Sequence, residues 1–180
     1  MSNATIDVIL SRRSIRHYSN QAISDQDLEQ IVQCGLHAPS ARNRQNWHFT
    51  VITNKEMIEM MHELTQKGME TRGLKVDPNE HTFYHAPVVI VISSLIEGFS
   101  ELNAGCAIEN MAIAAKSLGI DSCIIGQTRF MYTQTNKVDI NRMLKIPMDY
   151  EHDCAICFGY RNGENPEPKE RKEGVVDFIR

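Results

Sequence analysis

Apolar residues along the chain follow two patterns, one typical of helices with a buried face and one typical of buried strands. Leu28 is followed by apolar residues three, four and eight positions later, at Ile31, Val32 and Leu36, which places them on one side of a helix. Similar spacing or composition predicts helices over residues 5–10, 25–36, 55–64, 102–118 and 135–144. Short runs of β-branched and other apolar residues predict strands over residues 47–53, 87–93, 121–126 and 153–160.

Residues at the ends of these segments support the helix boundaries. Ser24 and Asn54 stand just before two of the helices, and a short polar side chain at that position accepts a backbone N–H. Gly119 follows the helix over 102–118 and suits its C-terminal end. The segment 66–80 is polar and contains glycines and a proline, so we expect a mobile loop or lid there.

Two segments indicate how the elements are layered. The helix over 102–118 is rich in Ala and Met and nearly apolar all round, which predicts burial in a core or at a subunit interface. The strand over 87–93 is a continuous Val and Ile run, typical of a strand covered on both faces. Strands separated by helices indicate an α/β or α+β domain, and the two helices before the first strand argue against a simple doubly wound sheet.

Length and charge limit the classes of protein to consider. The chain has 180 residues, enough for one domain with a real core, and we expect a single domain over 1–180. Its formal net charge of -4 argues against broad nucleic-acid binding, so any anion site must be local. The longest apolar run, 86–96, is shorter than the ~20 residues of a membrane-spanning helix. The first residues lack the order of a signal peptide, so we expect a cytoplasmic protein without a membrane partner.

Cysteine and histidine give little sign of redox or metal chemistry. The five cysteines are scattered and are interpreted as buried thiols. Cys154 and Cys157 form a C-x-x-C, but on a strand they would point to opposite faces, which disfavours a redox pair. His81 and His85 have helical metal-ligand spacing, but an H-E-x-x-H glutamate is missing and Pro87 follows at once, so we expect no metal site. The sequence also lacks G-x-G-x-x-G, Walker and G-x-S-x-G motifs.

Three segments gather basic and polar side chains around this apolar framework. Residues 12–18 read Arg-Arg-Ser-Ile-Arg-His-Tyr, residues 38–47 read Ala-Pro-Ser-Ala-Arg-Asn-Arg-Gln-Asn-Trp, and the tail contains Lys169, Arg171 and Lys172. Arginine presents a planar set of donors that suits phosphate, so these segments predict a site for an anionic small molecule. Other interpretations of single segments remain: arginines at a helix C-terminus, a helix stop at Pro39, and a solvated charged tail.

Taken in order, these segments resemble the nitroreductase family of FMN-dependent, NAD(P)H-linked flavoproteins. The resemblance rests on Arg12-Arg13-Ser14-Ile15-Arg16-x-Tyr18, on Pro39-Ser40-x-x-Asn43-x-Gln45-x-Trp47, and on Lys169-x-Arg171. The segments 86–91, 105–126 and 158–160 also match, so the resemblance covers nearly the whole chain. It implies an α+β three-layer sandwich, with a central mixed β-sheet flanked by helices, in an intertwined homodimer. The tail over 161–180, which ends in apolar residues, would dock on the partner subunit.

The resemblance also implies roles for individual residues at an FMN site shared between two subunits. Arg12, Ser14, Lys169 and Arg171 would hold the phosphate and ribityl chain, with Arg13 as a further candidate. Arg16 and Asn79 would lie at the pyrimidine edge of the flavin, and the backbone of Ile125 and Gly126 would pass flavin N5. Residues of the second segment would come from the partner subunit; the cofactor-binding candidates there are Pro39, Ser40, Ala41, Asn43 and Gln45.

The implied activity is an FMN-dependent oxidoreductase that uses NADH or NADPH to reduce nitro compounds, quinones or similar small acceptors. Hydride would pass through flavin N5 in a ping-pong scheme, without a catalytic side chain. The alternatives are a specialised FMN enzyme (a reductive dehalogenase, an enoate-type reductase or a flavin-degrading enzyme) and a non-catalytic flavin-binding protein. The chain departs from the family at Asn46, where proline is common, and at Thr82, where some members have a lysine near the flavin. Gln127 lies at a variable position near the substrate.

Overall fold

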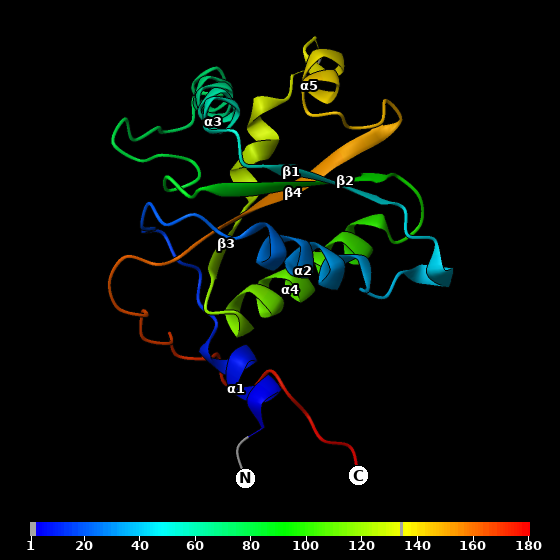
Figure 1. Ribbon diagram of the computed structural model, residues 1–180. Coiled ribbons are helices and arrows are strands. Elements are labelled where there is room, and N and C mark those ends of the chain that lie inside the picture. The colour runs from blue at the N-terminus through cyan, green and yellow to red at the C-terminus, as the bar shows by residue number, and fades with distance from the viewer. Residues whose placement is uncertain (1–2, 134) are drawn as a thin grey trace.

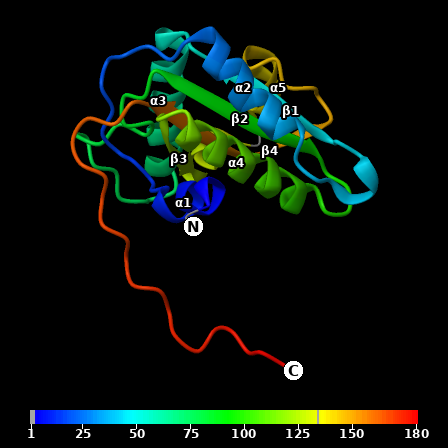
Figure 2. The same ribbon diagram turned by 60° about the horizontal axis from the view of Figure 1, so that its bottom comes forward.

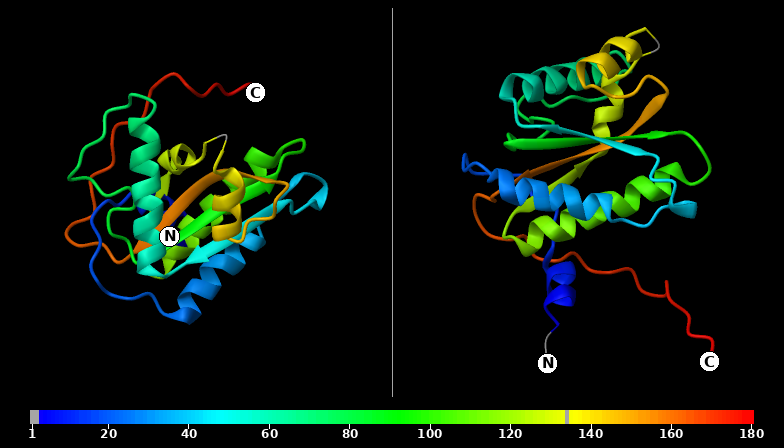
Figure 3. Two further views of the ribbon diagram at one scale, coloured as in Figure 1. Left: turned by 90° about the horizontal axis from the view of Figure 1, so that it is seen from above. Right: turned by 45° about the vertical axis from the view of Figure 1, so that its right-hand side comes forward.

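The computed structural model describes residues 3–133 and 135–180. Helices cover both faces of a central sheet, which gives three layers (Figures 1 and 3). The strands are β1 (Trp47–Ile52), β2 (Val88–Leu95), β3 (Asp121–Ile125) and β4 (Tyr150–Gly159). The helices are α1 (Ala4–Ser11), α2 (Asp25–Leu36), α3 (Lys55–Glu70), α4 (Ser100–Ser117) and α5 (Lys137–Met143), with 3₁₀ helices η1 (Ala41–Asn43) and η2 (Gly126–Met131). The predicted α+β sandwich with helices on both faces of the sheet is therefore confirmed.

The sheet has the strand order β1-β2-β4-β3, and each of its three strand pairs is antiparallel. The prediction of a mixed sheet is therefore wrong for the described residues. A continuous Val and Ile run shows that both faces of β2 are covered, but it does not show the direction of the neighbouring strands. Helices cover this antiparallel sheet on both faces, so β2 is as apolar as a strand in a buried parallel sheet.

Residues of the central strands alternate between two hydrophobic cores. Val89 and Val91 of β2 face α3, η2 and α5, where they pack with Met61 and Ile140 among others. The residues between them, such as Ile90, face α2 and α4 on the other side. Figure 1 shows α3 and α5 above the sheet and α2 and α4 below it. The helix over 102–118 was expected to be buried, and α4 indeed supplies much of this second core.

The expected helix ends are confirmed in atomic detail. The Ser24 hydroxyl accepts the backbone N–H of Asp27 at 3.1 Å, and the Asn54 side chain accepts that of Met57 at 2.7 Å. Gly119 follows α4 with a φ of 76°, a left-handed conformation that glycine adopts without the strain of a Cβ atom. Local sequence therefore fixes where α2, α3 and α4 begin or end.

Two boundaries lie three or more residues from the prediction, and one element was not predicted. The helix α3 continues to Glu70, so only the later part of 66–80 is a loop. Gly68 suggested a break, but inside α3 it lets another backbone approach closely. The 3₁₀ helix η2 was not predicted, because its sequence shows no helical spacing. Strand β4 begins at Tyr150, three residues early, because its half-buried first residues pair with the end of β2 after a bulge.

The cysteines are free thiols. Cys154 packs with the core next to α4, whereas Cys157 lies in the core next to α3, so the two point to opposite faces of β4 as expected. Cys34 is exposed, so its assignment as a buried thiol is wrong.

Residues 161–180 form no helix or strand and are largely exposed. Figure 2 shows this segment running away from the sheet and its helices. Its first part is fastened near the end of α1, where Asn165 donates to the carbonyl oxygen of Ser11 at 3.1 Å. Docking of the tail on a partner subunit stays a prediction.

Candidate functional site

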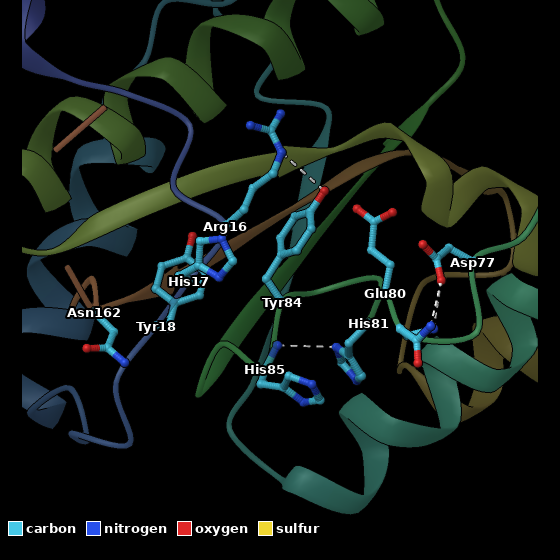
Figure 4. Close-up of a pocket in the computed structure, with 10 residues that line it drawn as sticks. Arg16, His17, Tyr18, Asp77, Glu80, His81, Tyr84, His85 and Asn162 are labelled. Carbon is cyan, nitrogen blue, oxygen red and sulfur yellow. Dashed lines mark hydrogen bonds between the residues drawn. The ribbon is translucent and has the colours of Figure 1, made fainter. Parts of the chain in front are cut away.

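A pocket of about 470 Å³ forms where three distant segments meet (Figure 4). Arg16, His17 and Tyr18 come from the segment after α1, and Asn162 comes from the segment after β4. The connection between α3 and β2 supplies the remaining wall; its lining residues are Asp77, Asn79, Glu80, His81, Tyr84 and His85. The lining therefore combines cationic, amide, carboxylate and aromatic groups.

The pocket brings together Arg16 and Asn79, the two side chains expected at the pyrimidine edge of a flavin. Arg16 Nε donates to the Tyr84 hydroxyl at 3.3 Å, and its guanidinium lies 5.8 Å from the centre of that ring. The bond to Tyr84 raises the pKa of Arg16, and burial raises the pKa of the Tyr84 hydroxyl. The pocket therefore contains a permanent cation beside a neutral phenol.

Residues 12–16 run beside the edge of the sheet formed by β3. Ser14 forms an isolated parallel bridge with Ser122, and the N–H of Ile15 donates to the Ser122 carbonyl oxygen at 3.0 Å. Arg12 Nε pairs with the Glu109 carboxylate of α4 at 3.2 Å. This pairing along β3 places Arg12, Ser14 and Arg16 in one row that leads toward the pocket.

Ile125 and Gly126 stand where β3 turns into η2. The hydroxyl of Thr128 donates to the carbonyl oxygen of Ile125 at 2.9 Å and closes this turn. A Cβ atom placed on Gly126 would meet no atom within 4 Å. The structure thus leaves open space beside the backbone at Gly126.

The second predicted segment lies at the opposite end of the molecule from the pocket, as the two views in Figures 1 and 3 agree. Ser40 accepts the N–H of Gln45 at 3.0 Å, and the Asn43 side chain accepts from the Gln45 amide at 3.1 Å. Ala41 N–H donates to Asn103 of α4 at 3.0 Å. One chain therefore does not bring the candidates of this segment to the pocket; they are Pro39, Ser40, Ala41, Asn43 and Gln45.

The tail candidates also lie outside the pocket in the described chain. Lys169 and Arg171 are exposed, and Arg171 donates to the Lys169 carbonyl oxygen at 3.2 Å. Arg13 donates to three carbonyl oxygens, those of Leu10, Arg12 and Pro166. Arg13 thus links the end of α1 to the tail, a role that the sequence did not predict.

Comparison with known proteins assigns the family. The sequence model of the Nitroreductase family matches residues 9–160. The chain belongs to the nitroreductase family. A relative from Archaeoglobus fulgidus is 30% identical over 173 residues, covering 93% of this chain and 87% of its own, and its name proposes an NADH dehydrogenase or NAD(P)H nitroreductase activity. The NADPH-flavin oxidoreductase of Vibrio harveyi is 25% identical over 94% of this chain and 70% of its own.

Solved structures of nitroreductases share the fold over nearly the whole chain. A nitroreductase with bound FMN from Bacteroides fragilis superposes with a TM-score of 0.91 at 28% identity, covering 99% of this chain and 100% of that one. One from Desulfitobacterium hafniense, also with bound FMN, has a TM-score of 0.91 at 27% identity and covers all of both chains. Among the described residues, no helix has the length and apolar character needed to cross a membrane.

Two departures from the nitroreductase motifs have a structural explanation in this chain. Asn46 is buried, donates to the Leu95 carbonyl oxygen at 3.1 Å, and accepts from Asn103 at 3.0 Å. Thr82 is also buried, and its hydroxyl bonds to His62 Nδ1 at 2.9 Å. Because Thr82 points toward α3, it does not line the pocket as a long lysine side chain could.

The segment after Glu80 is fastened to α3 by a histidine cluster. His81 Nε2 lies 3.4 Å from a carboxylate oxygen of Glu59, and the His62 and His81 rings are 4.2 Å apart. Within the described chain, Glu59, His62 and His81 are side chains of metal-ligating type whose ligand atoms lie within 4.8 Å of one another. The spacing of Glu59 and His62, one helical turn apart, is the sequence signal that could have identified this cluster.

The hydrogen bonds of this cluster do not suit a metal ion. Nδ1 of His81 accepts backbone N–H groups from Phe83 and His85 at 3.1 and 3.3 Å, and Nδ1 of His62 accepts that of Thr82 at 3.2 Å. A neutral ring with Nδ1 as acceptor has its proton on Nε2, which a metal would need free. Burial lowers the pKa of His81 to about 4. We therefore interpret the cluster as a neutral hydrogen-bonding network that positions the pocket wall.

Proposed function

We propose that this protein is an FMN-dependent oxidoreductase that takes electrons from NADH or NADPH and reduces nitro compounds, quinones or similar small molecules. The pocket with Arg16 and Asn79 supports the proposal most directly, because one cavity presents the expected cation and amide. The FMN bound to the two solved nitroreductases and the NADPH-flavin name of a relative point to the same cofactor and donor.

The residues present fit such a cofactor. Arg16 and Asn79 offer N–H donors to a polar, partly anionic edge, and the open backbone at Gly126 admits a flat group without a clash. Arg12 and Ser14 lie in the same row beside β3 and would hold the phosphate with charge-assisted hydrogen bonds. Lys169 and Arg171 would join them through movement of the tail.

When bound, FMN supplies the redox chemistry by accepting two electrons from the nicotinamide and passing them to the acceptor. The side chains bind and orient: Arg16 offers positive charge to the pyrimidine edge, and the Gly126 backbone leaves room at the reactive edge. Donor and acceptor would use the same open face in turn, which predicts ping-pong kinetics.

We also propose that the site is completed by a second copy of this chain. The segment with Ser40 and Asn43 lies too far from its own pocket to contact a ligand there. Apolar side chains of α1 are exposed: Ile6, Ile9 and Leu10 have 53%, 46% and 68% of their surface accessible. Exposed apolar groups of this kind favour a subunit interface.

Absorbance spectroscopy of the purified protein tests the proposal. We expect a flavin spectrum, present as purified or gained with added FMN, that bleaches with NADH or NADPH under anaerobic conditions. A protein that gains no flavin spectrum contradicts the proposal. Bleaching without turnover of nitroaromatics or quinones would favour a specialised FMN enzyme, and tight FMN binding without bleaching would favour a non-catalytic flavin-binding protein.

A further inference from the structure

Tyr84 contacts the pocket cation in two ways, through its hydroxyl and through its ring. We propose that Tyr84 is a positioning residue that sets the direction of the Arg16 guanidinium in the pocket, and so tunes how strongly the site prefers reduced FMN. The part about FMN rests on the proposed function. The part about Arg16 can be tested without any cofactor.

The hydrogen bonds of Arg16 show which of its nitrogens Tyr84 fixes. Nε donates to the Tyr84 hydroxyl at 3.3 Å, whereas a terminal nitrogen reaches the Ser14 carbonyl oxygen only at 3.5 Å, the outer limit for such a bond. Tyr84 therefore holds the guanidinium at its Nε end. The two terminal NH₂ groups are left as the donors that a ligand in the pocket can use.

Tyr84 is itself fixed by its neighbours in the chain. Tyr84 and His85 have φ angles of 54° and 56°, a left-handed conformation that is uncommon for bulky residues. Backbone bonds to His81 hold this turn, and the adjacent Phe83 is fully buried. Strained backbone that is held in place at a pocket is a frequent property of functional segments. The tyrosine ring is thus a rigid support for Arg16.

Glu80 gives Arg16 an alternative partner. Its carboxylate lines the same pocket and attracts the guanidinium. In Figure 4 the ring of Tyr84 stands between Arg16 and Glu80. An Arg16 side chain free of Tyr84 could turn toward this carboxylate, which would partly neutralise the positive charge offered to a ligand.

A fixed cation at the pyrimidine edge matters most for the reduced flavin, because that form has the greater negative charge. Loss of the Tyr84 hydroxyl should therefore weaken binding of reduced FMN more than binding of oxidised FMN. The net contribution of one such hydrogen bond corresponds to about a fivefold change in affinity. The same factor in the affinity ratio of the two redox forms lowers the flavin midpoint potential by about 20 mV, since tenfold corresponds to 29.6 mV.

The test uses Tyr84→Phe, which removes only the hydroxyl, with Arg16→Gln and the double variant. Tyr132→Phe is the matched control, because the Tyr132 hydroxyl is buried without a hydrogen-bond partner among the described residues. FMN affinity and midpoint potential are measured for each holoenzyme. NMR of the Arg16 Nε–H signal in the cofactor-free protein reports on the Tyr84 contact alone.

We expect Tyr84→Phe to shift the Arg16 signal and lower the potential, and Tyr132→Phe to do neither. In the Arg16→Gln background, Tyr84→Phe should cause no further shift in potential. An unchanged Arg16 signal and potential in Tyr84→Phe, or full additivity in the double variant, would overturn the inference. If wild-type protein does not bind FMN, the proposed function fails instead, and the NMR result still decides whether Tyr84 positions Arg16.

Discussion

Arg12 and Arg13 are adjacent in the chain but use their guanidinium groups differently. Arg13 donates to backbone carbonyl oxygens at both Nε and a terminal nitrogen, which ties it to the end of α1 and to the tail. Arg12 bonds to Glu109 through Nε only, and its terminal nitrogens have no acceptor among the described residues. Arg12 is therefore available for a phosphate group, whereas Arg13 has a structural role.

This difference predicts unequal effects of two similar substitutions. Arg12→Ala should weaken FMN binding about 30-fold, or about 2 kcal/mol, because a phosphate oxygen loses charge-assisted hydrogen bonds. Arg13→Ala should weaken it less than about threefold. Titration of the cofactor-free variants with FMN, followed by flavin fluorescence, measures both. Equal losses in the two variants would contradict the assignment of the phosphate contact to Arg12.

A second prediction at the residue scale concerns pH. Burial raises the pKa of Asp153 to about 6, although the Ser94 hydroxyl donates to this carboxyl at 2.6 Å and opposes the shift. An unfolded Asp has a pKa near 3.9. The folded state thus binds the proton more tightly, and this contribution to stability is present at low pH and lost as pH rises through about 6.

Asp153→Asn should therefore raise the free energy of unfolding at pH 7, because the buried site no longer contains a charge while the amide oxygen still accepts from Ser94. The advantage should vanish near pH 4, where Asp153 of the wild type is protonated when folded. Urea unfolding of both proteins between pH 4 and 8 measures the difference. A difference that does not depend on pH would show that the carboxyl does not titrate in this range.

At the scale of elements, the backbones of α3 and η2 approach each other closely. A Cβ atom at Gly68 of α3 would lie 1.8 Å from the carbonyl oxygen of Phe130. Arg72 reinforces the contact, because its guanidinium donates to the carbonyl oxygens of Gly68, Phe130 and Tyr132. The turn after Gly126, a predicted cofactor-binding residue, is therefore positioned by the C-terminal end of α3.

Gly68→Ala should reduce the free energy of unfolding by about 3 kcal/mol or more, since backbone must move to admit the methyl group. For a protein of this size that is a fall of roughly 6–12 °C in Tm. Gly105→Ala in α4 is the comparison, because there the methyl group would meet no atom within 4 Å. We expect it to change stability by less than about 1 kcal/mol. Similar losses in both variants would contradict the α3–η2 contact.

The elements differ in how much of them the sequence could predict. Capping residues such as Ser24 and Asn54 act locally, so the starts of α2 and α3 were predicted correctly. Gly68 was interpreted as part of a loop because its close neighbour, Phe130, lies 62 residues away and no local pattern shows it. The role of Tyr84 was missed for the same reason: its partner Arg16 is 68 residues away.

At the scale of the whole molecule, sequence motifs predicted which residues form the site but not where the fold places them in space. Arg16 and Asn79 were expected at the same edge of a ligand, and both side chains line the pocket. The mixed sheet that the resemblance implied was wrong for the described residues, because their three strand pairs are all antiparallel. The segment with Ser40 and Asn43 was expected to reach the site of a partner subunit. In one chain it lies far from the pocket, and its place in a dimer stays a prediction.

Subunit complementation tests whether a second copy completes the site. We expect Arg12→Ala and Ser40→Ala/Asn43→Ala proteins each to lose FMN as homodimers, because every site then lacks one set of contacts. In a mixed dimer purified through two different tags, one site would contain both defects and the other would be intact. That dimer should therefore bind one tight FMN, measured as flavin absorbance per protein.

The stoichiometry distinguishes shared sites from sites built within one chain. If each chain supplied its own Arg12, Ser40 and Asn43, both sites of the mixed dimer would be defective and would bind FMN as weakly as the homodimers. A chain with all three substitutions, mixed with wild type, is the control. With shared sites, each of its pockets has one defect, so it should contain no tight site. With sites inside one chain it should retain one, which would show that the second segment does not act across the interface.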